Sequence, residues 1–222
     1  MEARLTRIDR GEMLRYLMWH GEVIPEEISD RLRQGEERLL QTAAPRAVWR
    51  VFDYKPGEPL GGTSFCPEGE DLRAFLDGCD QVILLAATLG TGPDSLQRQL
   101  RLRDMSEALI LDAAGSAAVE NVCDNLCADL AAAFAPRFLT DRFSPGYGDF
   151  PLSQQIWFFR LLDMNRRLGV CLNESGLMIP QKTVTAVLGV ADTPRAKRPA
   201  GCGSCALAEK CALRKEGKRC GT

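Results

Sequence analysis

Residues 142–155 combine residue types that suit the binding of a small zwitterion. The segment reads Arg-Phe-Ser-Pro-Gly-Tyr-Gly-Asp-Phe-Pro-Leu-Ser-Gln-Gln. Arg142 carries a planar guanidinium that matches a carboxylate, Pro145 fixes one backbone angle, and two glycines, Gly146 and Gly148, let the backbone approach a ligand closely. An ordinary surface turn has a similar composition, so these residues alone leave both interpretations open.

A second group of chemically active residues lies at the end of the chain. Four cysteines there follow the pattern Cys-x2-Cys-x5-Cys-x8-Cys: Cys202, Cys205, Cys211 and Cys220. This segment has few apolar residues for a core, so four thiolates on a metal would supply its folding free energy. Zinc and an iron-sulfur cluster both accept four cysteines, and the single Cys-x-x-Cys pair favours a cluster of the 4Fe-4S type. Free thiols are the remaining alternative.

The chain has an acidic body and a basic tail. Residues 192–222 contain eight Lys or Arg and three Asp or Glu, a net charge of +5, so the rest carries −7 to reach the total of −2. Neither part forms a long basic stripe, so nucleic acid is not an expected partner. No apolar run approaches the length of about 18 residues that spans a membrane. The nine cysteines suit a reducing compartment, and we expect a cytoplasmic protein.

Apolar patterning predicts one mixed domain over residues 1–191, a linker at 192–201 and the metal-binding tail at 202–222. Capping residues and helical spacing predict helices over residues 9–21, 25–44, 71–77, 105–135 and 154–167, the last capped by Ser153. Apolar and β-branched runs predict strands over residues 47–54, 81–88, 170–175 and 183–190. The last of these alternates as a half-buried strand should.

Three features of this body have both an ordinary and a functional explanation. Strand 81–88 runs into Leu-Gly-Thr-Gly-Pro, but a third glycine and a Gly-Lys-Ser/Thr motif are absent, which favours a plain turn over a phosphate cradle. Cys123 and Cys127 lie one helical turn apart and, with no further ligand nearby in the sequence, are expected in the core. Glu120 lies near the apolar face of the same helix, where a carboxylate needs a cationic partner unless it faces solvent.

Four stretches resemble the activation, or reactivation, domain of vitamin B12-dependent methionine synthase, in its stand-alone form. Arg-Phe-Ser-Pro-Gly-Tyr from Arg142 looks like the family's Arg-x-x-x-Gly-Tyr loop. Leu-Asn-Glu-Ser-Gly-Leu-Met-Ile-Pro from Leu172 is similar to its Leu-Thr-Glu-Ser-x-x-Met-x-Pro segment. Ala-Thr-Leu-Gly from Ala87 and the run over residues 112–120 look like the stand-alone members. The four stretches occur in the family's order.

The resemblance implies an α+β fold in which helices pack on a bent antiparallel sheet that binds S-adenosylmethionine. It also implies that the protein presents this methyl donor to an inactive cob(II)alamin methionine synthase during one-electron reduction, as an accessory component of methyltransferase activity. By position, Arg142, Ser144, Gly146 and Tyr147 match the ligand loop, and Glu120 matches the family's helix acid. Arg142 would then hold the carboxylate of S-adenosylmethionine and Glu120 its ammonium.

Two departures from the family limit what carries over. Multidomain members have a tyrosine where this chain has Leu188. They also continue with strand and helix where this chain has the cysteine tail, and the tail suggests a built-in electron route. The sole histidine, His20, is not part of the Asp-x-His-x-x-Gly motif of corrinoid-binding proteins. Cobalamin would therefore come from a partner, a methionine synthase core or a related corrinoid methyltransferase. The alternative function is a module that docks on a corrinoid protein without binding S-adenosylmethionine.

Overall fold

A four-stranded antiparallel sheet in the order β1-β2-β6-β3 organises the chain. The computed structural model describes residues 3–19, 21 and 23–194. The strands are β1 (Arg46–Asp53), β2 (Gln81–Thr88), β6 (Thr183–Ala191) and the short β3 (Phe138–Leu139). A separate hairpin pairs β4 (Cys171–Leu172) with β5 (Met178–Ile179). For these residues the expected α+β class, an antiparallel sheet with packed helices, is confirmed.

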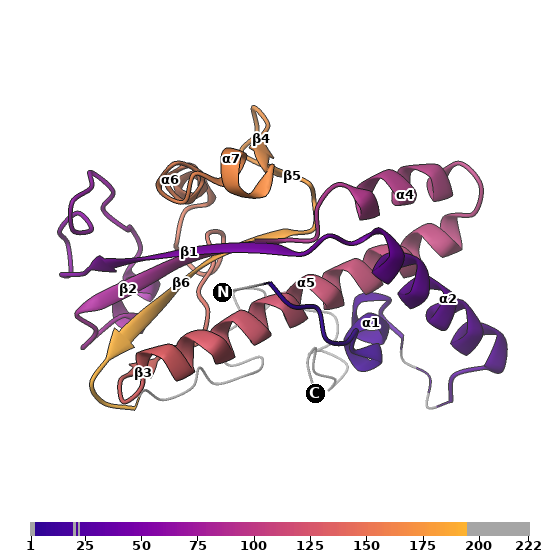
Figure 1. The fold of residues 1–222 in the computed structure, drawn as a ribbon, viewed down its shortest axis with the longest axis horizontal. Helices are drawn as coiled ribbons and strands as arrows, with labels where there is room; N and C mark the ends of the chain where they lie inside the picture. Colours follow the sequence, from indigo (N-terminus) through magenta and orange to yellow (C-terminus); the bar gives the residue numbers. More distant parts are fainter. Residues whose placement is uncertain (1–2, 20, 22, 195–222) are drawn as a thin grey trace.

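Helices cover both faces of the sheet (Figure 1). The long helix α5 (Met105–Phe134) runs along one face, and α1 (Arg10–Tyr16), α2 (Glu26–Thr42) and α4 (Gly92–Arg101) pack against it. The opposite face carries α6 (Gln155–Leu161), α7 (Met164–Leu168) and the β4–β5 hairpin. Two short elements complete the fold, α3 (Glu70–Phe75) and the 3-10 turn η1 (Leu152–Gln154). No helix in the described ranges is long and apolar enough to cross a membrane.

Helix α5 starts at a strong cap and packs closely. Asp104 Oδ1 accepts the N–H groups of Ser106 and Glu107 at 2.8 and 3.2 Å, an arrangement that stabilises a helix by about 1 kcal/mol. Small residues at its contacts allow neighbouring helices to approach closely. Where α2 meets α5, for example, a Cβ on Gly35 of α2 would lie 2.5 Å from Cγ2 of Ile110 in α5. Helix α5 is the central helix of this layer, because α1, α2 and α4 all contact it.

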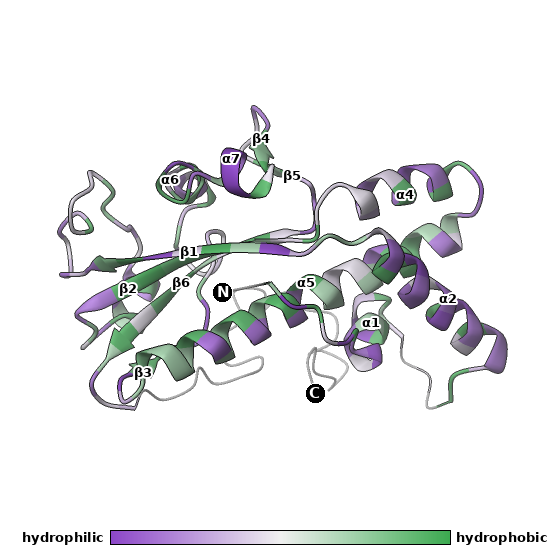
Figure 2. Cartoon of the chain, viewed as in Figure 1, coloured by the Kyte–Doolittle hydropathy of each residue, from purple (hydrophilic) through white to green (hydrophobic). Residues whose placement is uncertain are grey.

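The strand predicted to be half-buried is buried on both faces. In β6, Val187 belongs to the cluster under α6 and α7, whereas Leu188 packs with Ile83 and Leu126 on the side of α5. Figure 2 shows the strands largely in the colours of hydrophobic residues. The prediction was wrong because it assumed that the polar residues of the alternating pattern face solvent. Thr185 is one of these polar residues, yet it is only 3% exposed.

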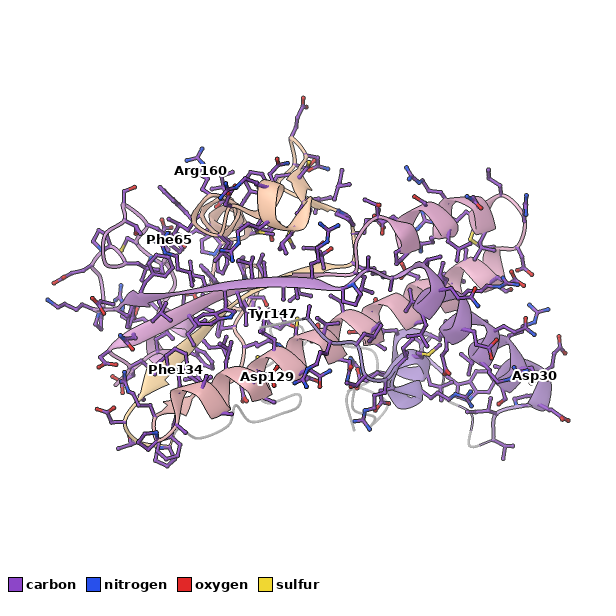
Figure 3. All side chains as sticks on the ribbon, viewed as in Figure 1. Asp30, Phe65, Asp129, Phe134, Tyr147 and Arg160 are labelled. Carbon is purple, nitrogen blue, oxygen red and sulfur yellow. The ribbon has the colours of Figure 1, made fainter. Side chains whose placement is uncertain are left out.

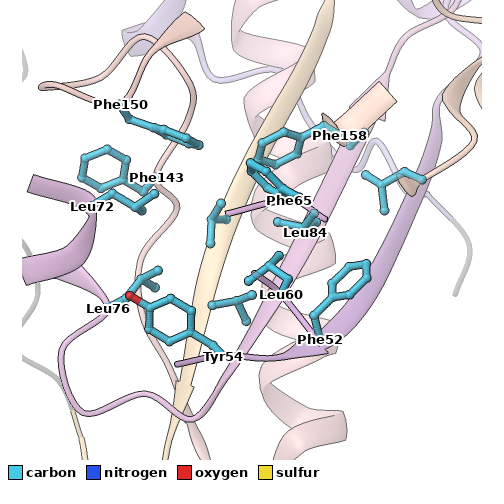
Figure 4. Packing of buried hydrophobic residues seen from close by; sticks show 14 of the residues in the cluster. Phe52, Tyr54, Leu60, Phe65, Leu72, Leu76, Leu84, Phe143, Phe150 and Phe158 are labelled. Carbon is cyan, nitrogen blue, oxygen red and sulfur yellow. The ribbon is translucent and has the colours of Figure 1, made fainter. Parts of the chain in front are cut away.

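An aromatic cluster on the outer face of the sheet anchors the segment that precedes α6. Phe143 and Phe150 are each 1% exposed and, as Figure 4 shows, they lie among the side chains of this cluster. Their ring centroids are 6.2 Å apart, and Phe143 lies 5.1 Å from Phe75 of α3. The residues between Phe143 and Phe150 are thus held at both ends by buried rings.

The single helix predicted over residues 154–167 is two helices. Asp163, with φ of 50°, adopts the left-handed conformation between α6 and α7, and Ser153 lies inside η1 without acting as a cap. The strand predicted over residues 170–175 is also shorter. Asn173 Oδ1 accepts the N–H groups of Ser175 and Leu177, at 3.0 and 2.9 Å, so the chain turns there and returns as β5. This side-chain competition for the backbone ends β4 early.

Candidate functional site

A cavity of about 640 Å³ lies between α5, the loop that follows β3, and the start of β6. Its size falls within the range of roughly 300–1,000 Å³ typical of small-molecule sites. Three carboxylates line it against one guanidinium, so the wall is acidic overall. The lining residues with charged, hydroxyl or amide side chains are Glu120, Asp124, Thr140, Asp141, Arg142, Ser144, Tyr147, Gln155, Thr183 and Thr185.

Helix α5 presents its acids at helical spacing. Glu120, Asp124 and Cys127 follow one another at intervals of four and three residues, so they leave the same face of the helix and meet the cavity together. Of these, the sequence identified Glu120 as a candidate and missed Asp124. The signal was available, because Asp124 lies one turn after Glu120 on the same face.

Arg142 joins the loop to this acidic face. Its Nη2 lies 2.6 Å from Glu120 Oε2 and its Nη1 lies 2.7 Å from Asp124 Oδ1, while Cys127 Sγ is 3.8 Å from Nη1. The Arg142 side chain is 20% exposed and that of Glu120 is 38% exposed. The cationic partner that Glu120 required is therefore Arg142, and the two residues proposed to hold opposite ends of one ligand hold each other.

Burial and charge set the protonation of this corner. Burial alone would lower the pKa of the Arg142 guanidinium, but Cys123 and Glu120 outweigh it and raise the pKa above its ordinary value. Burial raises the pKa of Cys127 and brings that of Cys123 to about 12. At neutral pH the arginine is charged and both thiols are protonated. The cysteines are therefore poor nucleophiles here, and Cys123 packs as a core residue as predicted.

The loop backbone is shaped by its own hydrogen bonds. The N–H of Tyr147 donates to the carbonyl of Ser144 at 3.1 Å, and that of Gly146 donates to the carbonyl of Phe150 at 2.9 Å. Asp149 caps α3 by accepting the N–H groups of Glu70 and Asp71, at 2.7 and 3.1 Å. The loop is thus fastened to α3 as well as to the aromatic cluster.

Not every residue of the predicted site meets the cavity. Glu120, Arg142, Ser144 and Tyr147 line it, whereas Gly146 does not. The φ of Gly146 is 93°, so this glycine serves the shape of the loop. Tyr147 is 60% exposed as a residue, and Figure 3 places its side chain between the sheet and α5.

Strand β6 and the start of α6 supply polar groups that the sequence did not identify. Thr183 Oγ1 lies 2.7 Å from the carbonyl oxygen of Pro180, and Gln155 Nε2 donates to the carbonyl of Gly176 at 2.8 Å. Thr185 completes this wall. Leu188, which the sequence resemblance aligns with a tyrosine of the multidomain proteins, is 1% exposed and does not line the cavity.

A second hollow of about 550 Å³ adjoins the first on the side of α1. The two share Glu120, Asp124 and Tyr147, so these residues form a partition between them. Tyr16 of α1 lines the second hollow, and burial, with the charge of Glu120, raises the pKa of its phenol.

The predicted metal site lies outside the described residues, since Cys202, Cys205, Cys211 and Cys220 all fall after residue 194. Within the ranges that are described, no group of three or more His, Cys, Asp or Glu side chains could hold a metal ion. His20 is also outside those ranges.

Comparison with known proteins supports the fold. No family model and no curated protein matches the sequence. Among solved structures, the chain is similar to one described as the MetH reactivation domain bound to AdoHcy, with a TM-score of 0.64 and 16% sequence identity. The match covers 96% of this chain and 82% of that chain. At this identity the likeness shows a shared fold.

Proposed function

We propose that this protein binds S-adenosylmethionine in the larger cavity and supports the reductive remethylation of a cob(II)alamin held by a partner, a methionine synthase or a related corrinoid methyltransferase. The observation that carries the proposal is the cavity itself. It joins one arginine, an acidic helix face and an exposed tyrosine on a fold shared with a domain described as bound to AdoHcy.

The charges of the wall complement those of S-adenosylmethionine. The ligand carries a carboxylate, an ammonium and a sulfonium, and the wall offers one guanidinium and three carboxylates. Binding would exchange ion pairs: the ligand carboxylate would take the place of Glu120 on Arg142, and Glu120 would turn to the ammonium. One ion pair is then replaced by two, in a partly buried site where charge-assisted hydrogen bonds are strong.

Each group of the site would have a separate task in this role. Arg142 and Glu120 would fix the amino-acid end of the ligand, and Tyr147 would cover it at the rim. Asp124 and Asp141 would lower the energy of the positive sulfonium in the wall. The cobalt and its corrin would come from the partner, so the task of this chain is to present the methyl group.

The cysteine tail would relay the electron, which an external one-electron donor has to supply. Four thiolates at Cys202, Cys205, Cys211 and Cys220 suit an iron-sulfur cluster, and zinc is the alternative metal. Iron and sulfide assays on anaerobically purified protein test this part separately. A protein that holds neither would remove the relay and leave the binding of S-adenosylmethionine to be judged on its own.

Titration calorimetry with S-adenosylmethionine tests the central claim. Replacing Arg142→Gln removes a charge-assisted contact to the ligand and should weaken binding about tenfold to a hundredfold. The matched control is Arg137→Gln, because Arg137 also bridges two carboxylates, Asp80 and Asp192, but does not line the cavity. Binding that is equally weakened in both variants would contradict the assignment.

The second candidate is a docking module that binds a corrinoid protein without S-adenosylmethionine. The position of Leu188 favours it, because a buried leucine stands where the family has a ligand tyrosine. The same titration separates the two functions. No heat with the wild-type protein, together with co-purification of a corrinoid protein, would select the docking module.

A further inference from the structure

A smaller cavity of about 190 Å³ lies between α4 and the segment that joins β5 to β6. Its volume equals that of about six waters at liquid density, which is room for a small metabolite. The residues that line it are separate from those of the larger cavity, although Ile179 and Gln181 belong to the same segment as Met178 and Thr183.

Two arginines of α4 line this cavity without a carboxylate partner. Arg98 and Arg101 are three residues apart, so their side chains leave the same side of the helix. Nη2 of Arg98 lies 3.3 Å from Ser95 Oγ, and neither guanidinium is ion-paired within the described part of the chain. Two planar cations at one cavity are suited to a carboxylate.

An acid with an unsatisfied oxygen lines the same cavity. Asp94 Oδ2 accepts the N–H of Gln181 at 2.8 Å, whereas Oδ1 is buried and has no hydrogen-bond partner among the described residues. The position of Asp94 in the first turn of α4 stabilises its charge but supplies no donor to Oδ1. A ligand that brings an N–H group to this carboxylate would therefore add a hydrogen bond that the described residues do not supply.

We propose that this cavity binds a small apolar α-amino acid. Arg98 and Arg101 would hold the carboxylate, Asp94 would accept the ammonium, and Ile179, which is 50% exposed, would cover the apolar side chain. A lone anion would leave Asp94 Oδ1 unsatisfied beside added negative charge. A lone amine would leave both arginines unpaired, so the zwitterion is the ligand class that satisfies all three groups.

Amide chemical-shift perturbation on the full chain tests the proposal, with leucine as the probe. Two analogues each lack one charged group: 4-methylpentanoate has no ammonium and isopentylamine has no carboxylate. Leucine should move the amide signals of residues 94–101 and 179–181, and each analogue should bind at least about tenfold more weakly. The double change Arg98→Gln with Arg101→Gln, and the single change Asp94→Asn, should weaken leucine binding to a similar degree.

Controls make each outcome decisive. Asn at position 94 still accepts the N–H of Gln181, and Arg103→Gln removes an exposed arginine that does not line the cavity, so it should leave binding unchanged. Unmoved signals at millimolar leucine, or equal binding of 4-methylpentanoate, would overturn the proposal. Binding of S-adenosylmethionine in the larger cavity is measured from the amide signals of Tyr147 and Thr185. The two cavities are therefore tested by separate signals, and a negative result for one says nothing about the other.

Discussion

The described part of the chain contains two turns with the pattern Gly-x-Gly, and the two turns have different roles. Gly90-Thr91-Gly92 joins β2 to α4, and Gly146-Tyr147-Gly148 lies at the larger cavity. In the first turn, a Cβ on Gly92 would lie 2.1 Å from the carbonyl oxygen of Thr42. Only a residue without a side chain therefore leaves room here for the backbone of α2. Gly92 is therefore required for close packing against α2, and the preference for a plain turn over a phosphate cradle stays a prediction.

The second turn meets a side chain instead of a backbone. A Cβ on Gly148 would lie 2.2 Å from Asp71 Oδ2, and both glycines of this turn have positive φ, 93° and 52°. Buried Phe143 and Phe150 hold its ends, while Tyr147 between the glycines stays exposed in the cavity wall. Glycine spacing therefore does not separate a packing turn from a binding loop. The two kinds of turn are distinguished by the residue between the glycines and by what that residue contacts.

The largest effect is expected at Gly92. Gly92→Ala should lower the free energy of unfolding by more than about 3 kcal/mol, because the added methyl meets a backbone carbonyl that cannot move without shifting α2. Urea denaturation measures the change. Its control is Gly62→Ala, where φ is 73° but the space is open, and the cost should be about 1 kcal/mol. Equal costs would mean that the contact with α2 is not what requires Gly92.

A smaller effect is expected at Gly148. Gly148→Ala meets the flexible end of Asp71 and a φ that alanine adopts with strain, so the loss should be about 1–3 kcal/mol. Asp71→Ala in the same chain removes the carboxylate and should recover part of that loss. A double-mutant cycle from urea denaturation measures the recovery. Strict additivity of the two changes would show that the Asp71 contact plays no part.

These two turns also show how far the sequence leads. It predicts β2 and α5 almost to the residue, because a continuous apolar run and the Asp104 cap are local signals. It does not predict the break at Asp163, because no glycine or proline marks a left-handed residue there. Local sequence patterns predict local conformation, whereas the division between α6 and α7 depends on how these helices pack on the rest of the fold.

The candidate site follows the same rule. Arg142 and Glu120 could be identified by residue type, but their ion pair joins positions 22 apart in the chain and depends on how the loop packs over α5. Gly146 was included for its type and lies outside the cavity lining. Thr183 and Gln155 were missed because a threonine in a strand and a glutamine at a helix start carry no local sign of a site.

The smallest effect on stability, with the clearest effect on binding, is expected at Tyr147. Tyr147 is 60% exposed, so Tyr147→Ala should change the free energy of unfolding by less than about 1 kcal/mol. The same change removes an aromatic surface at the cavity and should weaken the binding of S-adenosylmethionine about fivefold or more. Thr91→Ala, at the matching place in the other turn, should change neither quantity. Calorimetry on both variants therefore decides whether the two turns differ in function, and equal affinity in Tyr147→Ala and wild type would make the second turn a packing device like the first.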